Sequence, residues 1–196
     1  MTDTDKLRED KLREDMAYVR AAADRADAAT IPSINLLWAA IVLCGGVLSD
    51  FVGDYRWIGR FWSVAGPGGL CLSLWFGYRA QRHAGQADQR TGVRSGLHWL
   101  AFLVAGALGS ALVAAGHLEW AGFGSFMMLL MSLTYFHSGL HLDRRMLPIS
   151  GVAAASYVVT LFVPEYQWTL AGVLIAAALV WQGLLGVRTR NAAHQS

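Results

Sequence analysis

"WTLAGVLIAAALVWQGLLGV", residues 168–187, decides the class of fold, because it runs for twenty residues without a charged side chain. About 20 apolar residues in an α-helix cover the hydrocarbon thickness of a bilayer. Inside lipid every backbone N–H and C=O must be paired within the protein, and a helix satisfies this requirement within one segment. The stretch therefore predicts a membrane-spanning helix.

The same kind of stretch recurs five times toward the N-terminus. None of the six shows the ten-residue alternation of polarity that is typical of a transmembrane barrel strand. The sequence thus predicts an all-α integral membrane protein, folded as a six-transmembrane-helix bundle. The expected spans are residues 31–49, 59–78, 96–116, 120–141, 147–163 and 168–187.

The charges divide the chain into three parts. It has 196 residues and only 15% of them are charged, against roughly 25% in soluble proteins. Fourteen of the 30 charged residues lie in residues 1–30, which we interpret as a cytoplasmic N-terminal helical segment. Residues 31–187 then form the transmembrane domain and residues 188–196 a cytoplasmic tail. Residues 1–30 contain no apolar run typical of a signal peptide, so we expect the first span to direct insertion.

Basic residues predict the orientation of these spans. With both termini in the cytoplasm, fourteen Lys and Arg residues lie on the cytoplasmic side and only two on the other. This asymmetry is the positive-inside pattern of inner-membrane proteins. Arg144 and Arg145 would end the fourth span at the cytoplasmic interface. Aromatic rings favour the membrane–water interface, and we expect anchors at the outer interface from Trp62, Trp120 and Trp168.

A Trp-x3-Gly pattern opens each even-numbered span. Three repeated helical hairpins would explain it, and so would the frequent combination of interface tryptophan and packing glycine in membrane helices. In either case small residues let helix backbones approach closely. The pattern assigns helix packing to Gly66, Gly124 and Gly172.

The N-terminal segment contains a tandem repeat, "KLREDKLRED", residues 6–15. Its residues favour helix, and leucines recur on one side, which predicts a short amphipathic helix. We interpret it as a solvated helix or as a contact for a protein partner or a homo-oligomer. Acidic residues outnumber basic ones in residues 1–30, so binding to nucleic acid or to an anionic lipid surface is not expected.

Histidines provide the candidate ligand site of the chain. His137 and His141 stand four apart in "FHSGLHLDRR", residues 136–145, and His98 lies just inside the third span at a similar depth. Imidazole is a ligand for haem and transition metals, so His98, His137 and His141 are candidate metal ligands. Packing near the interface and a pH-sensitive role remain alternatives. Two cysteines inside spans, Cys44 and Cys71, are small apolar packing residues or a disulfide pair.

The stretches "LREDMAYVRAAADRAD", residues 12–27, and "IPSINLLWAAIVLCGGVLSDF", residues 31–51, resemble small bacterial inner-membrane proteins with six helices and a short cytoplasmic N-terminal helix. The resemblance implies this layout and carries no activity, catalytic residue or cofactor. Carboxylates in the spans lie only at their edges, which disfavours ion-coupled transport and intramembrane proteolysis. Our leading hypothesis is a non-enzymatic structural, sensory or partner-binding subunit. The alternatives are a haem- or metal-binding redox protein using the three histidines, and an oligomeric small channel or transporter.

Overall fold

The computed structural model describes residues 11–16, 31–84 and 89–193 of the chain. These residues belong to two compact units, one of residues 31–184 and one that includes residues 11–16 and 185–193. Residues 11–16 are helical and all six side chains are exposed. The rest of the expected N-terminal helix lies outside the described residues.

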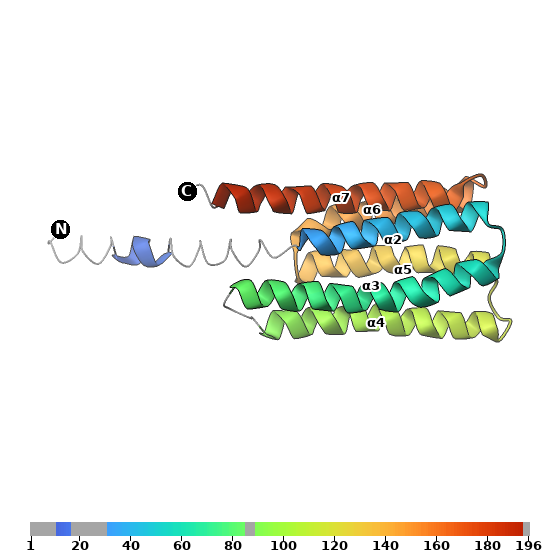
Figure 1. Ribbon diagram of the computed structural model, residues 1–196, viewed down its shortest axis with the longest axis horizontal. Helices are drawn as coiled ribbons and strands as arrows, with labels where there is room; N and C mark the ends of the chain where they lie inside the picture. Colours follow the sequence, from blue (N-terminus) through green and yellow to red (C-terminus); the bar gives the residue numbers. More distant parts are fainter. Residues whose placement is uncertain (1–10, 17–30, 85–88, 194–196) are drawn as a thin grey trace. The chain divides into compact units, whose positions relative to one another are not determined.

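Helices make up every regular element in the described ranges. The long helices of residues 31–184 lie side by side, and short segments connect the end of one helix to the start of the next (Figure 1). In chain order the elements are α2 (Pro32–Phe51), α3 (Tyr55–Ala84), α4 (Gln89–Ala114), α5 (Trp120–His141), the 3₁₀ turn η1 (Arg144–Met146), α6 (Leu147–Phe162) and α7 (Gln167–Ala193).

Local sequence explains where the helices begin and turn. Pro32 lies at the start of α2, and Pro148 at the start of α6, where a proline has no hydrogen bond to lose. The turn after α2 contains Gly53 with φ of +63°, and the turn after α4 contains Gly116 with φ of +74°. Only glycine adopts these left-handed conformations without strain. The turns are therefore fixed by the chain itself, and they make successive helices antiparallel.

Close contacts between helices confirm the antiparallel order. His98 of α4 meets the backbone of Thr134 in α5, whereas Gly109 of α4 lies against the Phe123 ring. The Ser150 carbonyl of α6 accepts a hydrogen bond from Ser132 of α5, whereas Thr160 of α6 lies beside Ser125 of α5. Gly183 of α7 approaches Pro32 of α2, whereas Gly172 of α7 approaches Val42 of α2. Each helix thus runs opposite to the neighbour that it contacts here.

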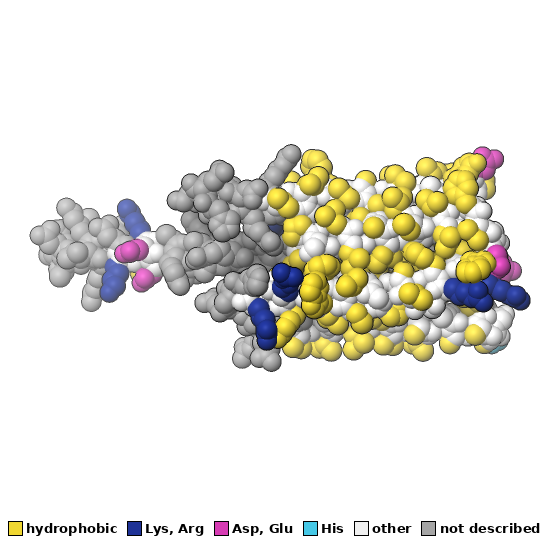
Figure 2. Space-filling view, in the orientation of Figure 1, with side chains coloured by type: hydrophobic (Ala, Val, Ile, Leu, Met, Phe, Trp, Pro, Cys, Tyr) yellow, Lys and Arg dark blue, Asp and Glu magenta, His cyan; other side chains and the backbone are white. Residues whose placement is uncertain are grey.

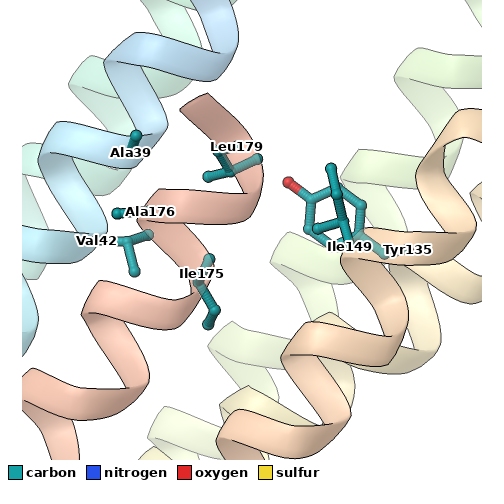
Figure 3. Packing of buried hydrophobic residues seen from close by; sticks show 7 residues of the cluster. All are labelled: Ala39, Val42, Tyr135, Ile149, Ile175, Ala176 and Leu179. Atoms are coloured by element: carbon teal, nitrogen blue, oxygen red, sulfur yellow. The ribbon is translucent and has the colours of Figure 1, made fainter. Parts of the chain in front are cut away.

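The bundle has both apolar and polar side chains in its interior, and its exterior is apolar. Its buried apolar cluster is small and joins α2, α5, α6 and α7, as Figure 3 shows for Ala39, Val42, Tyr135, Ile149, Ile175, Ala176 and Leu179. Among the residues whose burial the structure describes, eight buried ones are polar, namely Asn35, Ser132, Thr134, Ser138, Ser150, Ser156, Thr160 and Gln182. Large apolar side chains instead cover the outer surface (Figure 2). A soluble protein buries such side chains, whereas lipid solvates them.

Four helical segments among the described residues are long and apolar enough to cross a membrane: Pro32–Phe51, Val93–Ala114, Arg144–Phe162 and Gln167–Leu185. Together with the apolar exterior, they define a membrane-embedded helical protein. Helices α3 and α5 are long enough but less apolar. Helix α3 contains Pro67 and several glycines, and α5 contains six serine, threonine and histidine residues.

Candidate functional site

His98 connects α4 to the backbone of α5. Its Nε2 lies 2.9 Å from the carbonyl oxygen of Thr134. A carbonyl oxygen only accepts hydrogen bonds, so Nε2 carries a proton and donates it. Only Nδ1 of this half-buried imidazole is then left for another partner. The observed role of His98 is to hold two helices together.

His137 and His141 lie together on the exposed side of α5. Their rings are stacked with centroids 5.7 Å apart and planes 25° apart. Both side chains are exposed, whereas Thr134 and Ser138 on the adjacent strip of the same helix are buried. The two histidines thus face away from the packed interior.

The three histidines are not brought to one point with further ligands. Among the described residues, no group of three or more His, Cys, Asp or Glu side chains is arranged to hold a metal ion. His137 and His141 remain a two-nitrogen pair on one helix turn. Their exposed imidazoles can donate hydrogen bonds at the bundle surface.

A line of hydroxyl groups joins α5, α6 and α7. Ser132 Oγ donates to the Ser150 carbonyl at 3.1 Å, and Ser156 Oγ donates to the Val152 carbonyl at 2.9 Å. The same Ser156 hydroxyl lies 3.5 Å from the Ala171 carbonyl of α7. Nearer the other end, Ser125 and Thr160 hydroxyls are 3.4 Å apart. Such bonds stabilise helix pairs where water is absent.

Asp50 caps the N-terminus of α7 from the end of α2. Its Oδ2 accepts a hydrogen bond from the backbone N–H of Thr169 at 2.6 Å, and its Oδ1 lies 3.4 Å from the N–H of Trp168. The first N–H groups of a helix have no partner within the helix, and they carry partial positive charge. A carboxylate satisfies both needs. Asp50 therefore fixes α2 and α7 to each other at this end.

Two amide side chains occupy the opposite end of the α2–α7 contact. Gln182 Nε2 lies 3.4 Å from the Arg145 carbonyl and 3.6 Å from Met146 Sδ. Gln182 Oε1 and Asn35 Nδ2 are buried, and neither has a hydrogen-bond partner among the described residues. Each unpaired buried group of this kind destabilises its surroundings by about 1–3 kcal/mol.

The predicted packing glycines have three different environments. A Cβ at Gly124 would overlap the indole of Trp168, and one at Gly172 would lie 3.1 Å from the Val42 carbonyl oxygen. A Cβ at Gly66 would meet nothing within 4 Å. The closest backbone approach involves Gly46, whose Cβ would overlap the Trp168 carbonyl oxygen. Gly46 thus marks the crossing of α2 and α7.

The predicted anchors also differ in their surroundings. The Trp62 ring is half-buried against Gly45, and Trp168 packs on Gly124. Trp120 is exposed, and its ring centroid lies 6.0 Å from that of Phe123. Arg144 and Arg145 are exposed in η1, which Asp143 caps by accepting a hydrogen bond from the Arg145 N–H.

Cys44 and Cys71 are both exposed on the bundle surface and form no disulfide.

The chain was compared with known proteins. No family model, curated protein or solved structure is significantly similar to it.

Sequence reasoning did not foresee the cap at Asp50 or the position of Gly46. Asp50 was one of several carboxylates at span edges, and "LCGGVLSD", residues 43–50, carries no signal that would choose Gly46 over its neighbour. Asn35 and Gln182 were visible as the polar side chains near the ends of their spans, although their proximity was not.

Proposed function

We propose that the chain is a six-span bacterial inner-membrane protein without enzymatic activity, acting as a structural, sensory or partner-binding subunit. The observation that carries the proposal is the distribution of side chains, because apolar residues cover the outside and serine hydroxyl groups form hydrogen bonds between helices inside. This distribution suits a bundle that is surrounded by lipid on all sides.

The directions of the helices support the proposal of six spans. Helices α2, α4 and α6 run in one direction, so the chain must return between them through α3 and α5 (Figure 1). Helix α5 has 22 residues and α3 has 30. At 1.5 Å per residue both exceed the roughly 30 Å of a hydrocarbon core. These lengths support spanning by all six helices.

The arginine distribution supports cytoplasmic termini. The η1 turn and the end of α3 carry Arg144, Arg145, Arg79 and Arg82, whereas the opposite end of the bundle has Arg56 and Arg60. Under the positive-inside rule the first of these ends faces the cytoplasm. The outer turns are then those that contain Gly53, Gly116 and Tyr166.

Cysteine labelling tests this topology. In a Cys44→Ala/Cys71→Ala background, single cysteines replace Val52, Glu119, Glu165 or Arg82, all exposed positions. A membrane-impermeant maleimide added to spheroplasts should label the first three and leave position 82 unlabelled until the membrane is opened. Labelling of position 82 together with position 52 would contradict a crossing by α3.

The proposed partner contact lies in the N-terminal segment. Residues 11–16, "KLREDM", are helical and fully exposed, with Leu12 65% and Met16 61% accessible. Two exposed apolar side chains beside four charged ones are suited to docking on a protein surface. A homo-oligomer would use the same contact.

Truncation tests the docking role. A variant that lacks residues 1–28 should insert as well as the full chain, with the same labelling pattern. In-cell crosslinking through a benzoylphenylalanine at position 12 or 16 should give a defined adduct with the full chain. The same probe placed at Val64, an exposed residue of α3, is the matched control. Equal adduct patterns from both sites would refute docking through this segment.

A further inference from the structure

The seam between α4 and α5 has a core side and an outer side. Trp99 and Tyr135 mark the core side, with ring centroids 5.4 Å apart. The hydrogen bond from His98 to the Thr134 carbonyl sets the register between the helices. A helix turns 100° per residue. Arg94, four residues before His98, and His137, three residues after Thr134, therefore lie on the outer side of the seam at a similar depth in the membrane.

Basic side chains gather at this end of the outer side. Arg94, His137 and His141 are all exposed, and Arg144 is exposed in the η1 turn that follows. The neighbouring acid, Asp143, directs Oδ1 to the Arg145 N–H at 2.9 Å and caps η1. Helix α6, which also packs on α5, has no charged residue. His98 also lies nearby, and its Nε2 donates a hydrogen bond to the Thr134 carbonyl.

We propose that Arg94, His137, His141 and Arg144 bind the phosphate group of an anionic phospholipid of the cytoplasmic leaflet. Arginine pairs with phosphate oxygens through two parallel hydrogen bonds, and imidazole N–H groups add donors from α5. Basic sites between membrane helices on the cytoplasmic side bind such headgroups. The assignment of a leaflet rests on the topology proposed above.

Apolar residues next to the basic group favour a lipid over a free phosphate ion. One turn deeper along α5 lies Leu133, and the neighbouring position on α4 is Leu97; they are 51% and 60% exposed. Acyl chains of a lipid whose phosphate rests on Arg94 and His137 would cover both leucines. A free phosphate ion would leave them unchanged.

Native mass spectrometry of the full-length protein in detergent tests the site. The probes are phosphatidylglycerol and phosphatidylcholine with identical acyl chains. We expect the protein to bind phosphatidylglycerol at least fivefold more tightly, since one surface cation contributes about a fivefold preference. Arg94→Gln should reduce that preference by about fivefold or more. The double variant His137→Ala/His141→Ala, which removes the imidazole N–H donors, should also reduce it, and His137→Lys/His141→Lys, which supplies N–H donors at the same positions, should retain it.

Arg56→Gln is the matched control, because Arg56 is an exposed arginine at the opposite end of the bundle. It should leave the lipid preference unchanged. Equal affinity for the two lipids, or a preference that Arg94→Gln and the double histidine variant leave intact, would overturn the proposal. Displacement of phosphatidylglycerol by an equal concentration of inorganic phosphate would reassign the site to a free anion and overturn the lipid assignment.

The proposed topology and the proposed lipid site are tested by different measurements, so each can be refuted separately. The lipid preference is measured in detergent, where neither leaflet exists, whereas cysteine labelling in spheroplasts reports the orientation. Loss of the preference with the expected labelling pattern would overturn the site alone. A reversed labelling pattern with the preference retained would overturn the topology alone, and with it the choice of leaflet.

Discussion

Replacing Gly46 by alanine tests the close crossing of α2 and α7. The added Cβ would overlap the carbonyl oxygen of Trp168 and would lie 3.1 Å from its carbonyl carbon and 3.4 Å from the Cα of Gly172. All three are backbone atoms, so they move only if α7 moves. Overfilling a packed interface of this kind destabilises a protein by about 1–3 kcal/mol.

The same movement would weaken the cap on α7. Asp50 holds the Thr169 N–H at 2.6 Å, and a hydrogen bond to a charged group contributes about 1.5–3 kcal/mol. Since a small shift removes only part of that bond, we expect Gly46→Ala to lower the free energy of unfolding by about 2–4 kcal/mol.

The measurement is the midpoint of thermal unfolding of the detergent-solubilised protein, followed by far-ultraviolet circular dichroism. Gly77→Ala in α3 is the matched control, because its Cβ meets nothing within 4 Å and alanine is the better helix former. Its midpoint should equal or exceed that of the wild type. If Gly46→Ala unfolds at the same temperature as Gly77→Ala, the close approach of α2 and α7 is wrong.

Four further changes test other contacts. Asp50→Ala should destabilise the detergent-solubilised protein by about 1–3 kcal/mol, since it removes the cap of α7. Asp50→Asn should destabilise it less, because one acceptor oxygen remains to cap the helix. Equal midpoints for wild type and Asp50→Ala would contradict the cap. Gln182→Met should change stability by less than about 1 kcal/mol, because a buried unpaired oxygen leaves together with two long hydrogen bonds. A loss above about 2 kcal/mol in the same melt would reveal a stronger partner. His98→Ala should lower the unfolding midpoint by about 1–2 kcal/mol in free energy, while its copper content, measured by mass spectrometry after dialysis, should equal that of the wild type; lost copper would restore His98 as a ligand. Replacing Cys44 and Cys71 together by alanine should leave the midpoint and the migration on non-reducing gels unchanged, and a mobility difference that reductant abolishes would indicate a disulfide.

Helix positions followed closely from the sequence. Residues 120–141 were expected as one span and form α5, and residues 147–163 nearly coincide with α6. Apolar runs set these boundaries because a helix in lipid must extend until the chain reaches water. Helices α3 and α7 run beyond their expected spans, to Ala84 and Ala193. Backbone hydrogen bonds continue a helix past the apolar run, so apolarity alone does not mark its end.

The sequence did not predict which face of each helix is buried in the bundle. Thr134, Ser138 and His141 share a face by spacing, yet the first two are buried and His141 is exposed. The candidate histidine site was therefore located by depth along the helix but not by direction around it.

The sequence by itself determined a helical membrane protein, the places of its turns and the charge difference between its ends, because hydrophobic length, glycine conformation and arginine position are local properties. Tertiary structure decided that Gly46 and not Gly66 lies at a close crossing, that Asp50 caps a distant helix, and that His98 bonds to Thr134 while His137 and His141 face outward. The physical reason is the solvent. Lipid is as apolar as a protein core, so hydrophobicity does not distinguish the buried side of a membrane helix from its exposed side, and only the fit of neighbouring helices makes that choice.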